Sequence, residues 1–149
     1  DNLLKLNYTN ISLVDISSNA LKEVKDRLQN KSLNFIETDI LNFNSNDKYD
    51  IWHDRAVFHF ITNLEGIKKY ISLCNEYIKK EGILIMGTFA EDGPLKCSGL
   101  EIKRYSVDQI SGLFKETFEL VESFKMLHKT PFDTEQSFSF CVLRKFTHH

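Results

Sequence analysis

The sequence predicts an α/β fold with a mostly parallel sheet and a C-terminal antiparallel hairpin. Three observations predict it. Short β-prone runs alternate with segments of helical periodicity, which is the pattern of strand–helix–strand units. Acidic residues directly follow several of these runs, at the positions where parallel sheets carry ligand sites. The last two β-prone runs are separated by a turn too short for a helical crossover, so they should pair antiparallel.

The first strand–helix–strand unit is predicted close to residue 11. Residues 11–14 form a β-prone run that ends at Asp15. Ser17 or Ser18 can cap the following helix, because a hydroxyl oxygen accepts hydrogens from the unpaired amides of the first turn. Residues 33–36 form the second strand, and Asp39 follows it. The helix between the strands has apolar residues at helical spacing, namely Ala20, Leu21, Val24 and Leu28.

A third strand, a second helix and a fourth strand are predicted between residues 49 and 86. The third strand covers residues 49–53. Thr62 and Glu65 have the spacing of a capping box, so a helix should begin near Asn63. Gly82 should end that helix in the left-handed conformation. Residues 83–86 are continuously apolar, as expected of a strand buried on both faces. The apolar face of the helix would consist of Leu64, Ile67, Ile71, Cys74 and Ile78.

The C-terminal third is predicted to hold a long connection, a helix and the hairpin. Residues 90–105 form the connection, and long connections within compact domains are often functional. Ser106 and Gln109 have capping-box spacing, which marks the start of a helix. Residues 120–128 and 138–144 read as the two strands, because apolar residues alternate along the second of them.

Composition limits the class of protein. The 149 residues suffice for one domain, expected to span 1–149, and the formal net charge of −2 argues against nucleic acid as a partner. No apolar run approaches the roughly 20 residues that cross a bilayer, so no membrane segment is expected. The three cysteines are far apart and lack metal-ligand spacing, which predicts free thiols, a cytoplasmic protein and no metal site.

The segment 49–60 is the most informative one for chemistry, because a short apolar strand runs directly into His53, Asp54 and Arg55. His53 or His59 could take a proton from a nucleophile, since histidine titrates near neutral pH. Asp54 could accept a hydrogen from a substrate, and Arg55 could clamp a carboxylate with two parallel hydrogen bonds. The alternative is a local ion pair between Asp54 and Arg55, with His53 as an ordinary half-buried histidine.

In this order of elements the chain resembles the class I S-adenosylmethionine-dependent methyltransferases. Their sheet is Rossmann-like, with a terminal strand that runs antiparallel at the edge. The run Trp-His-Asp-Arg-Ala-Val-Phe-His-Phe at 52–60, with Thr-Phe-Ala at 88–90 and Asp-Gly-Pro at 92–94, resembles one bacterial branch of that family. The resemblance covers nearly the whole chain. It implies S-adenosylmethionine as the cofactor and a methyl acceptor that is a small molecule or a protein.

The resemblance also assigns cofactor-binding residues. It implies that Asp15 accepts hydrogen bonds from both ribose hydroxyls and that Asp39 accepts one from the adenine amino group. Asp54 would hold the ammonium group of the methionine part. The alternatives are a solvent-exposed acid at a helix start for Asp15 and a turn residue for Asp39. The remaining implied contacts come from Ile16 against the adenine ring, Ser17 as a helix cap, and the Ile40 amide to a ring nitrogen.

One part of the family pattern is missing. The first strand and its glycine-rich loop should precede residue 1, and none of the glycines here forms Gly-x-Gly. In that fold the first strand lies between the second and the fourth, so its absence would leave two inner strands with unpaired amides. We therefore expect an N-terminally truncated domain. The alternatives are a non-catalytic binding or scaffold module and a nicotinamide-dependent oxidoreductase, and homo-oligomerisation is left open.

Overall fold

The computed structural model describes residues 11–15, 18–28, 33–55, 57–94, 96–97, 100–130 and 135–147. The chain forms two compact units, residues 1–44 and 45–149. A single domain over 1–149 therefore stays a prediction. Within the described residues, no helix is both long enough and apolar enough to traverse a lipid bilayer.

The first unit contains a strand–helix–strand motif, as the sequence predicts. Strand β1 (Ile11–Asp15) and strand β2 (Leu33–Glu37) are joined by helix α2 (Ser18–Leu28) and pair in parallel. Ile11 lies opposite Leu33, and Asp15 lies opposite Glu37. A short 3-10 helix, η1 (Ile40–Asn42), follows β2. The carboxyl ends of both strands consequently lie at the same edge of this small sheet.

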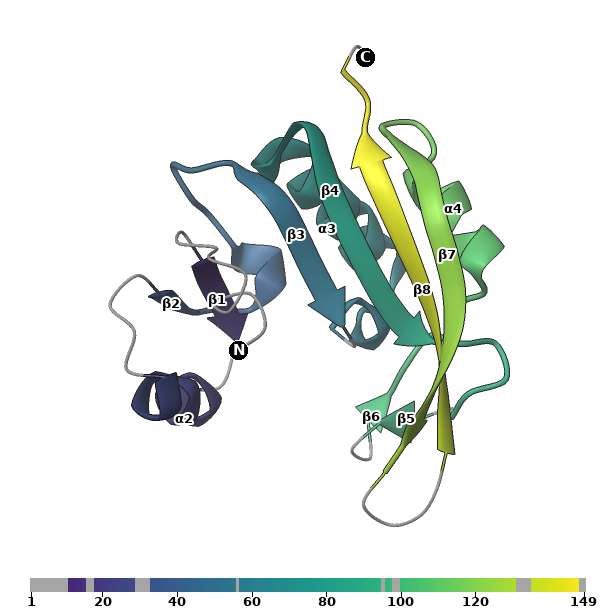
Figure 1. The fold of residues 1–149 in the computed structure, drawn as a ribbon, viewed down its shortest axis with the longest axis horizontal. Coiled ribbons are helices and arrows are strands. Elements are labelled where there is room, and N and C mark those ends of the chain that lie inside the picture. Colours follow the sequence, from purple (N-terminus) through teal and green to yellow (C-terminus); the bar gives the residue numbers. More distant parts are fainter. Residues whose placement is uncertain are drawn as a thin grey trace. The chain divides into compact units, whose positions relative to one another are not determined.

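The second unit is built on a four-stranded mixed sheet with the order β3-β4-β8-β7 (Figure 1). Strand β3 (Tyr49–Arg55) is parallel to β4 (Ile78–Phe89). Strands β7 (Phe118–Lys129) and β8 (Glu135–Lys145) form the predicted antiparallel hairpin. The expectation that the terminal strand lies at the edge is wrong. Strand β8 lies between β4 and β7, because it pairs antiparallel with both, and β7 is the edge strand.

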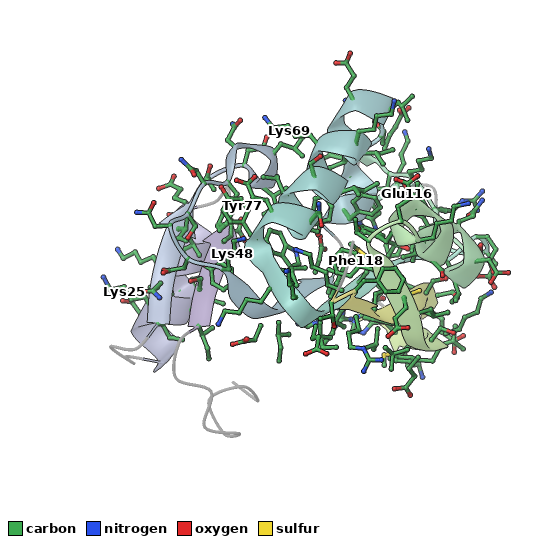
Figure 2. The ribbon with its side chains drawn as sticks, turned by 90° about the horizontal axis from the view of Figure 1, so that it is seen from above. Lys25, Lys48, Lys69, Tyr77, Glu116 and Phe118 are labelled. Carbon is green, nitrogen blue, oxygen red and sulfur yellow. The ribbon has the colours of Figure 1, made fainter. Side chains whose placement is uncertain are left out.

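Helices α3 (Leu64–Tyr77) and α4 (Val107–Phe114) lie on the same side of this sheet (Figures 1 and 2). The residues of the sheet that face them are buried, among them Leu84, Met86 and Leu143. Phe118, labelled in Figure 2, contacts Phe114 of α4 with ring centroids 5.8 Å apart. The remaining short elements are the 3-10 helix η2 (Phe58–Phe60) and the strands β5 (Lys96–Cys97) and β6 (Leu100–Glu101).

Helix α3 begins where predicted, but its cap and its buried face differ from the prediction. The Asn63 side chain, rather than that of Thr62, accepts a hydrogen bond from the Gly66 amide at 2.6 Å. Leu64, which was expected in the core, is 64% exposed. The buried face is instead rotated toward two tyrosines that the apolar pattern left out, and it consists of Gly66, Ile67, Tyr70, Leu73, Cys74 and Tyr77.

The end of α3 also differs from the prediction. The helix stops at Tyr77, and β4 begins at Ile78. The residue with positive φ is Glu81, at 64°, so Gly82 is not the left-handed terminator. A Cβ at Gly82 would lie 2.7 Å from the Lys79 carbonyl oxygen. Gly82 is therefore required for the close approach of two backbone segments.

Sheet strands alternate their side chains between two faces. Asp54 contacts Tyr70 of α3, so its neighbours on β3 point to the other face of the four-stranded sheet. That face carries His53, Arg55, Phe138 and Phe140, and we call it the open face. Gly87 lies at its centre, between Arg55 on β3 and Phe140 on β8. A Cβ at Gly87 would lie 2.4 Å from Cε1 of Phe140, so the Phe140 ring occupies the space above this glycine.

Lys145 ties β8 to the C-terminal end of α3. Its Nζ donates to the carbonyl oxygens of Asn75 at 2.5 Å and Ile78 at 2.8 Å. A cation at this end of a helix also complements the helix dipole. We expect Lys145→Met to lower the free energy of unfolding by about 1 kcal/mol, measured by urea denaturation. Lys80→Met, which removes an exposed lysine on β4, is the control. Equal stability of the two variants would contradict the stabilising role of the Lys145 contacts with α3.

Candidate active site

Asp54 lies near the end of β3 and is only 5% exposed, because three internal donors surround its carboxylate. Oδ1 accepts hydrogen bonds from the amides of Val57 at 2.9 Å and Phe58 at 3.3 Å. Oδ2 accepts a short hydrogen bond from the Tyr70 hydroxyl of α3. That hydroxyl oxygen in turn accepts from Trp52 Nε1 at 3.1 Å. Asp54 thus fixes the turn into η2 and attaches β3 to α3.

Burial dominates the electrostatics of this network. It raises the pKa of Asp54, although the Tyr70 hydroxyl and the two amides act in the opposite direction. Burial and the adjacent Asp54 raise the pKa of Tyr70 well above its usual value, so the phenol stays protonated and donates. Burial likewise raises the pKa of the Cys74 thiol, which is free. Both Asp54 oxygens are occupied by internal donors, so a ligand role for Asp54 stays a prediction.

His59 is fully buried on η2, with its imidazole between the rings of Phe60 and Phe89 at centroid distances of 4.7 Å. Nδ1 accepts a hydrogen bond from the Phe89 amide at 3.2 Å. This assignment puts the ring hydrogen on Nε2, which has no partner among the described residues. Burial lowers the pKa to about 4. In this geometry His59 is a neutral donor, and its lone pair is not available for the base role that the sequence suggested.

His53 and Arg55 point to the open face and are exposed. The ion pair between Asp54 and Arg55 that the sequence left open is absent from the described residues, because neighbouring residues of a strand point to opposite faces. The Arg55 guanidinium lies 5.2 Å from the centroid of Phe138, and Nη2 is 3.4 Å from Nδ1 of His128. Sequence reasoning missed His128. The alternation of the hairpin could have placed it on a face, but not beside β3.

Asp15 and Asp39 come together in the first unit. Asp15 ends β1 and is exposed, and its carbonyl oxygen accepts from the Thr38 amide at 3.0 Å, one residue before Asp39. The Asp39 carboxylate is also exposed, and its Oδ1 accepts from the Leu41 amide at 3.0 Å, which caps η1. Ile40, the first residue of η1, is half-buried. The predicted Ile16 and Ser17 lie outside the described residues.

Metal chemistry was not expected from the sequence. Within the ranges that the structure describes, no three His, Cys, Asp or Glu side chains form a group that could hold a metal ion. The candidate site residues are thus two exposed carboxylates at one strand edge in the first unit, and the Asp54 network, His59 and the open-face pair Arg55–His128 in the second unit.

Parallel strands with acids at their carboxyl ends, together with a mixed sheet that ends in an antiparallel hairpin, define a Rossmann-like α/β protein. A family model described as a methyltransferase domain matches residues 3–138. The chain belongs to this methyltransferase-domain family, as the sequence resemblance implied.

Individual relatives agree with the family. A curated relative, malonyl-[acyl-carrier protein] O-methyltransferase 2 of Ilyobacter polytropus, is 34% identical over 91 residues, which are 60% of this chain and 34% of the relative. The chain thus matches about a third of that protein's length. The N-methyltransferase NodS of Bradyrhizobium japonicum has the same fold, with a TM-score of 0.73, 15% identity and coverage of 91% and 72% of the two chains. TehB of Haemophilus influenzae superposes with a TM-score of 0.74 and 17% identity, and the match covers 97% of this chain and 53% of TehB.

Proposed function

We propose that the protein is an S-adenosylmethionine-dependent methyltransferase that acts in the cytoplasm on a small-molecule or protein acceptor. The match of the methyltransferase-domain family over residues 3–138 carries this proposal. The position of Asp15 and Asp39 at one strand edge supports it, because that edge is where Rossmann-like folds bind the nucleoside part of a ligand.

The residues of the first unit fit the nucleoside part of S-adenosylmethionine. The exposed Asp15 carboxylate can accept from two vicinal hydroxyls, and the exposed Asp39 carboxylate can accept from an amino group. Half-buried Ile40 offers an apolar surface and a backbone amide next to Asp39. Two acceptors beside an apolar side chain match a ribose and an adenine, which present donors at their edges and an apolar ring face.

The bound cofactor would supply an already activated sulfonium methyl group, so the protein's main contribution is to place the acceptor in line with it. Asp54 keeps the turn after β3 in place through the Val57 and Phe58 amides. His59 offers a hydrogen at Nε2 and stays neutral at physiological pH. His53 is exposed and is the residue of this segment that remains suited to take a proton from a nucleophile.

The acceptor class is suggested by one relative. The Ilyobacter protein is named for O-methylation of a malonyl group on acyl carrier protein. A carboxylate-bearing acceptor is therefore the form of the proposal that we favour. A non-catalytic module is the second candidate, and it is favoured by the Asp54 carboxylate, whose oxygens are both occupied by internal donors.

Calorimetric titration with S-adenosylhomocysteine tests the cofactor part. We expect Asp15→Ala to weaken binding by about thirtyfold, which corresponds to ~2 kcal/mol for lost hydrogen bonds to a charged acceptor. Asp26→Ala, which removes an exposed acid from α2 of the same unit, should bind as the unchanged protein does. No heat of binding at millimolar ligand, or equal losses in the two variants, would remove the proposal.

A further inference from the structure

The open face carries a cation whose position is fixed from two sides. The Arg55 side chain leaves β3 opposite Gly87 of β4 and reaches Phe138 on β8 and His128 on β7. It thus reaches across β4 to side chains of β8 and β7. The ring of Phe138 and the imidazole of His128 both contact the guanidinium. A side chain that is ordered before a ligand arrives loses less entropy on binding.

The charge of this guanidinium is not balanced by a described carboxylate. Glu119 pairs with Arg144, and Glu91 and Asp92 both pair with Lys125. Among the residues that the structure describes, Arg55 has no ion-pair partner, and its polar side-chain contact is the imidazole of His128. An exposed cation with no carboxylate partner among the described residues is available to bind an anion from solution.

The contact with His128 leaves room for an anion. The distance of 3.4 Å between Nη2 and Nδ1 is longer than a usual hydrogen bond, so His128 holds the guanidinium less strongly than a bound oxyanion would. In the tautomer that carries the ring hydrogen on Nδ1, the imidazole presents a second donor beside the guanidinium fork. An oxyanion at this place would therefore receive hydrogen bonds from both residues.

The surroundings strengthen such an interaction. The Phe138 ring under the guanidinium contacts Phe89 at a centroid distance of 5.0 Å and Phe140 at 6.0 Å. Phe124 stacks on Phe140 at 5.2 Å. This aromatic surface lowers the local dielectric constant on one side of the cation, which increases its attraction for an anion.

We propose that Arg55 and His128, held over the Phe138 ring, form the subsite that binds a carboxylate of the methyl acceptor. The guanidinium carries one positive charge, which matches a carboxylate monoanion better than a phosphate dianion. The planar fork of arginine also fits the two oxygens of a carboxylate. The subsite lies at the carboxyl end of β3, where parallel strands carry their ligands. The assignment of this carboxylate to the methyl acceptor rests on the proposed function, whereas the carboxylate subsite itself rests on the contacts of the open face alone.

The test is an NMR titration of the 149-residue chain with sodium acetate, with sodium chloride at equal ionic strength as the reference. The imidazole resonances of His128, assigned with His128→Gln, should shift to saturation with acetate. Arg55→Gln should lower the apparent acetate affinity by about tenfold, which corresponds to ~1.4 kcal/mol. The acetate affinity of Arg55→Lys should fall between those of the unchanged protein and Arg55→Gln, because lysine keeps the positive charge and lacks the planar fork. Arg144→Gln removes another exposed arginine from the same face and should have no effect.

The outcomes separate the two proposals. Equal effects of Arg55→Gln and Arg144→Gln, or His128 resonances that do not move with acetate, would overturn the subsite, whatever the cofactor titration shows. Tighter binding of inorganic phosphate than of acetate would overturn the carboxylate assignment. Saturable acetate binding that depends on Arg55, without any binding of S-adenosylhomocysteine, would uphold the subsite and overturn the proposed methyl transfer.

Discussion

Replacing Asp54 with alanine is expected to lower the free energy of unfolding by about 3–5 kcal/mol, because it leaves buried donors without an acceptor. The Tyr70 hydroxyl and the amides of Val57 and Phe58 all donate to this carboxylate. Urea denaturation followed by the fluorescence of Trp52, the chain's single tryptophan, measures the loss. Trp52 donates to Tyr70, so its emission should also report the network directly.

Asp54→Asn is the matched variant, since its amide oxygen can still accept from the two backbone amides. We expect a smaller loss than with alanine, and a different dependence on pH. The pKa of Asp54 is raised in the folded state, so the folded state binds this proton more tightly than the unfolded chain does. Stability from this group is fully present below the unfolded pKa of about 3.9 and declines as the pH rises through the folded value. The advantage of the unchanged protein over Asp54→Asn should shrink from pH 4 upward. Alanine and asparagine variants of equal stability would contradict the network.

The second large effect is expected from His59. Its contribution to the free energy of unfolding is lost as the pH falls, whereas that of Asp54 is lost as the pH rises. Burial lowers the pKa of His59 from its ordinary value of 6.5 to about 4. The unfolded chain therefore takes up this proton at a higher pH than the folded state does. Stability from the group is complete above pH 6.5 and declines as the pH falls toward 4. A shift of this size corresponds to roughly 3 kcal/mol over that interval.

The measurement is a series of urea denaturation curves between pH 7 and pH 4 for the unchanged protein and for His59→Gln. The glutamine side chain does not titrate, so its free energy of unfolding should lack the decline of roughly 3 kcal/mol. His128→Gln, which removes an exposed histidine, should keep that decline. If His59→Gln declines with pH as steeply as the unchanged protein, the imidazole is not held neutral by burial.

Local sequence patterns predicted most elements, because caps and periodicity are local. The capping box of Ser106 and Gln109 is present with both of its hydrogen bonds, and the hairpin pairs antiparallel as expected. The buried face of α3 was misjudged because tyrosine reads as a surface residue until its hydroxyl has a buried partner. Tyr70 has that partner in Asp54, which lies 16 residues earlier in the chain.

The candidate site was predicted less well, for the same reason. The sequence singled out Asp54, Arg55 and His59 from their position after a strand, but their partners come from distant segments. His128 reaches Arg55 only because β8 lies between β4 and β7, and no local pattern specifies that strand order. Likewise, the acceptor role of His59 Nδ1 depends on the backbone of Phe89, 30 residues away.

Asp54 and Arg55 are consecutive residues that have different roles on the two faces of one strand. The carboxylate secures the interior beneath α3, whereas the guanidinium faces outward over the aromatic rings. The two side chains point to opposite faces of the strand, and their contacts are with different residues. Evolution or engineering can therefore substitute positions 53 and 55, and so change what the outward face binds, while the hydrogen bonds of Asp54 on the inward face keep the second unit folded.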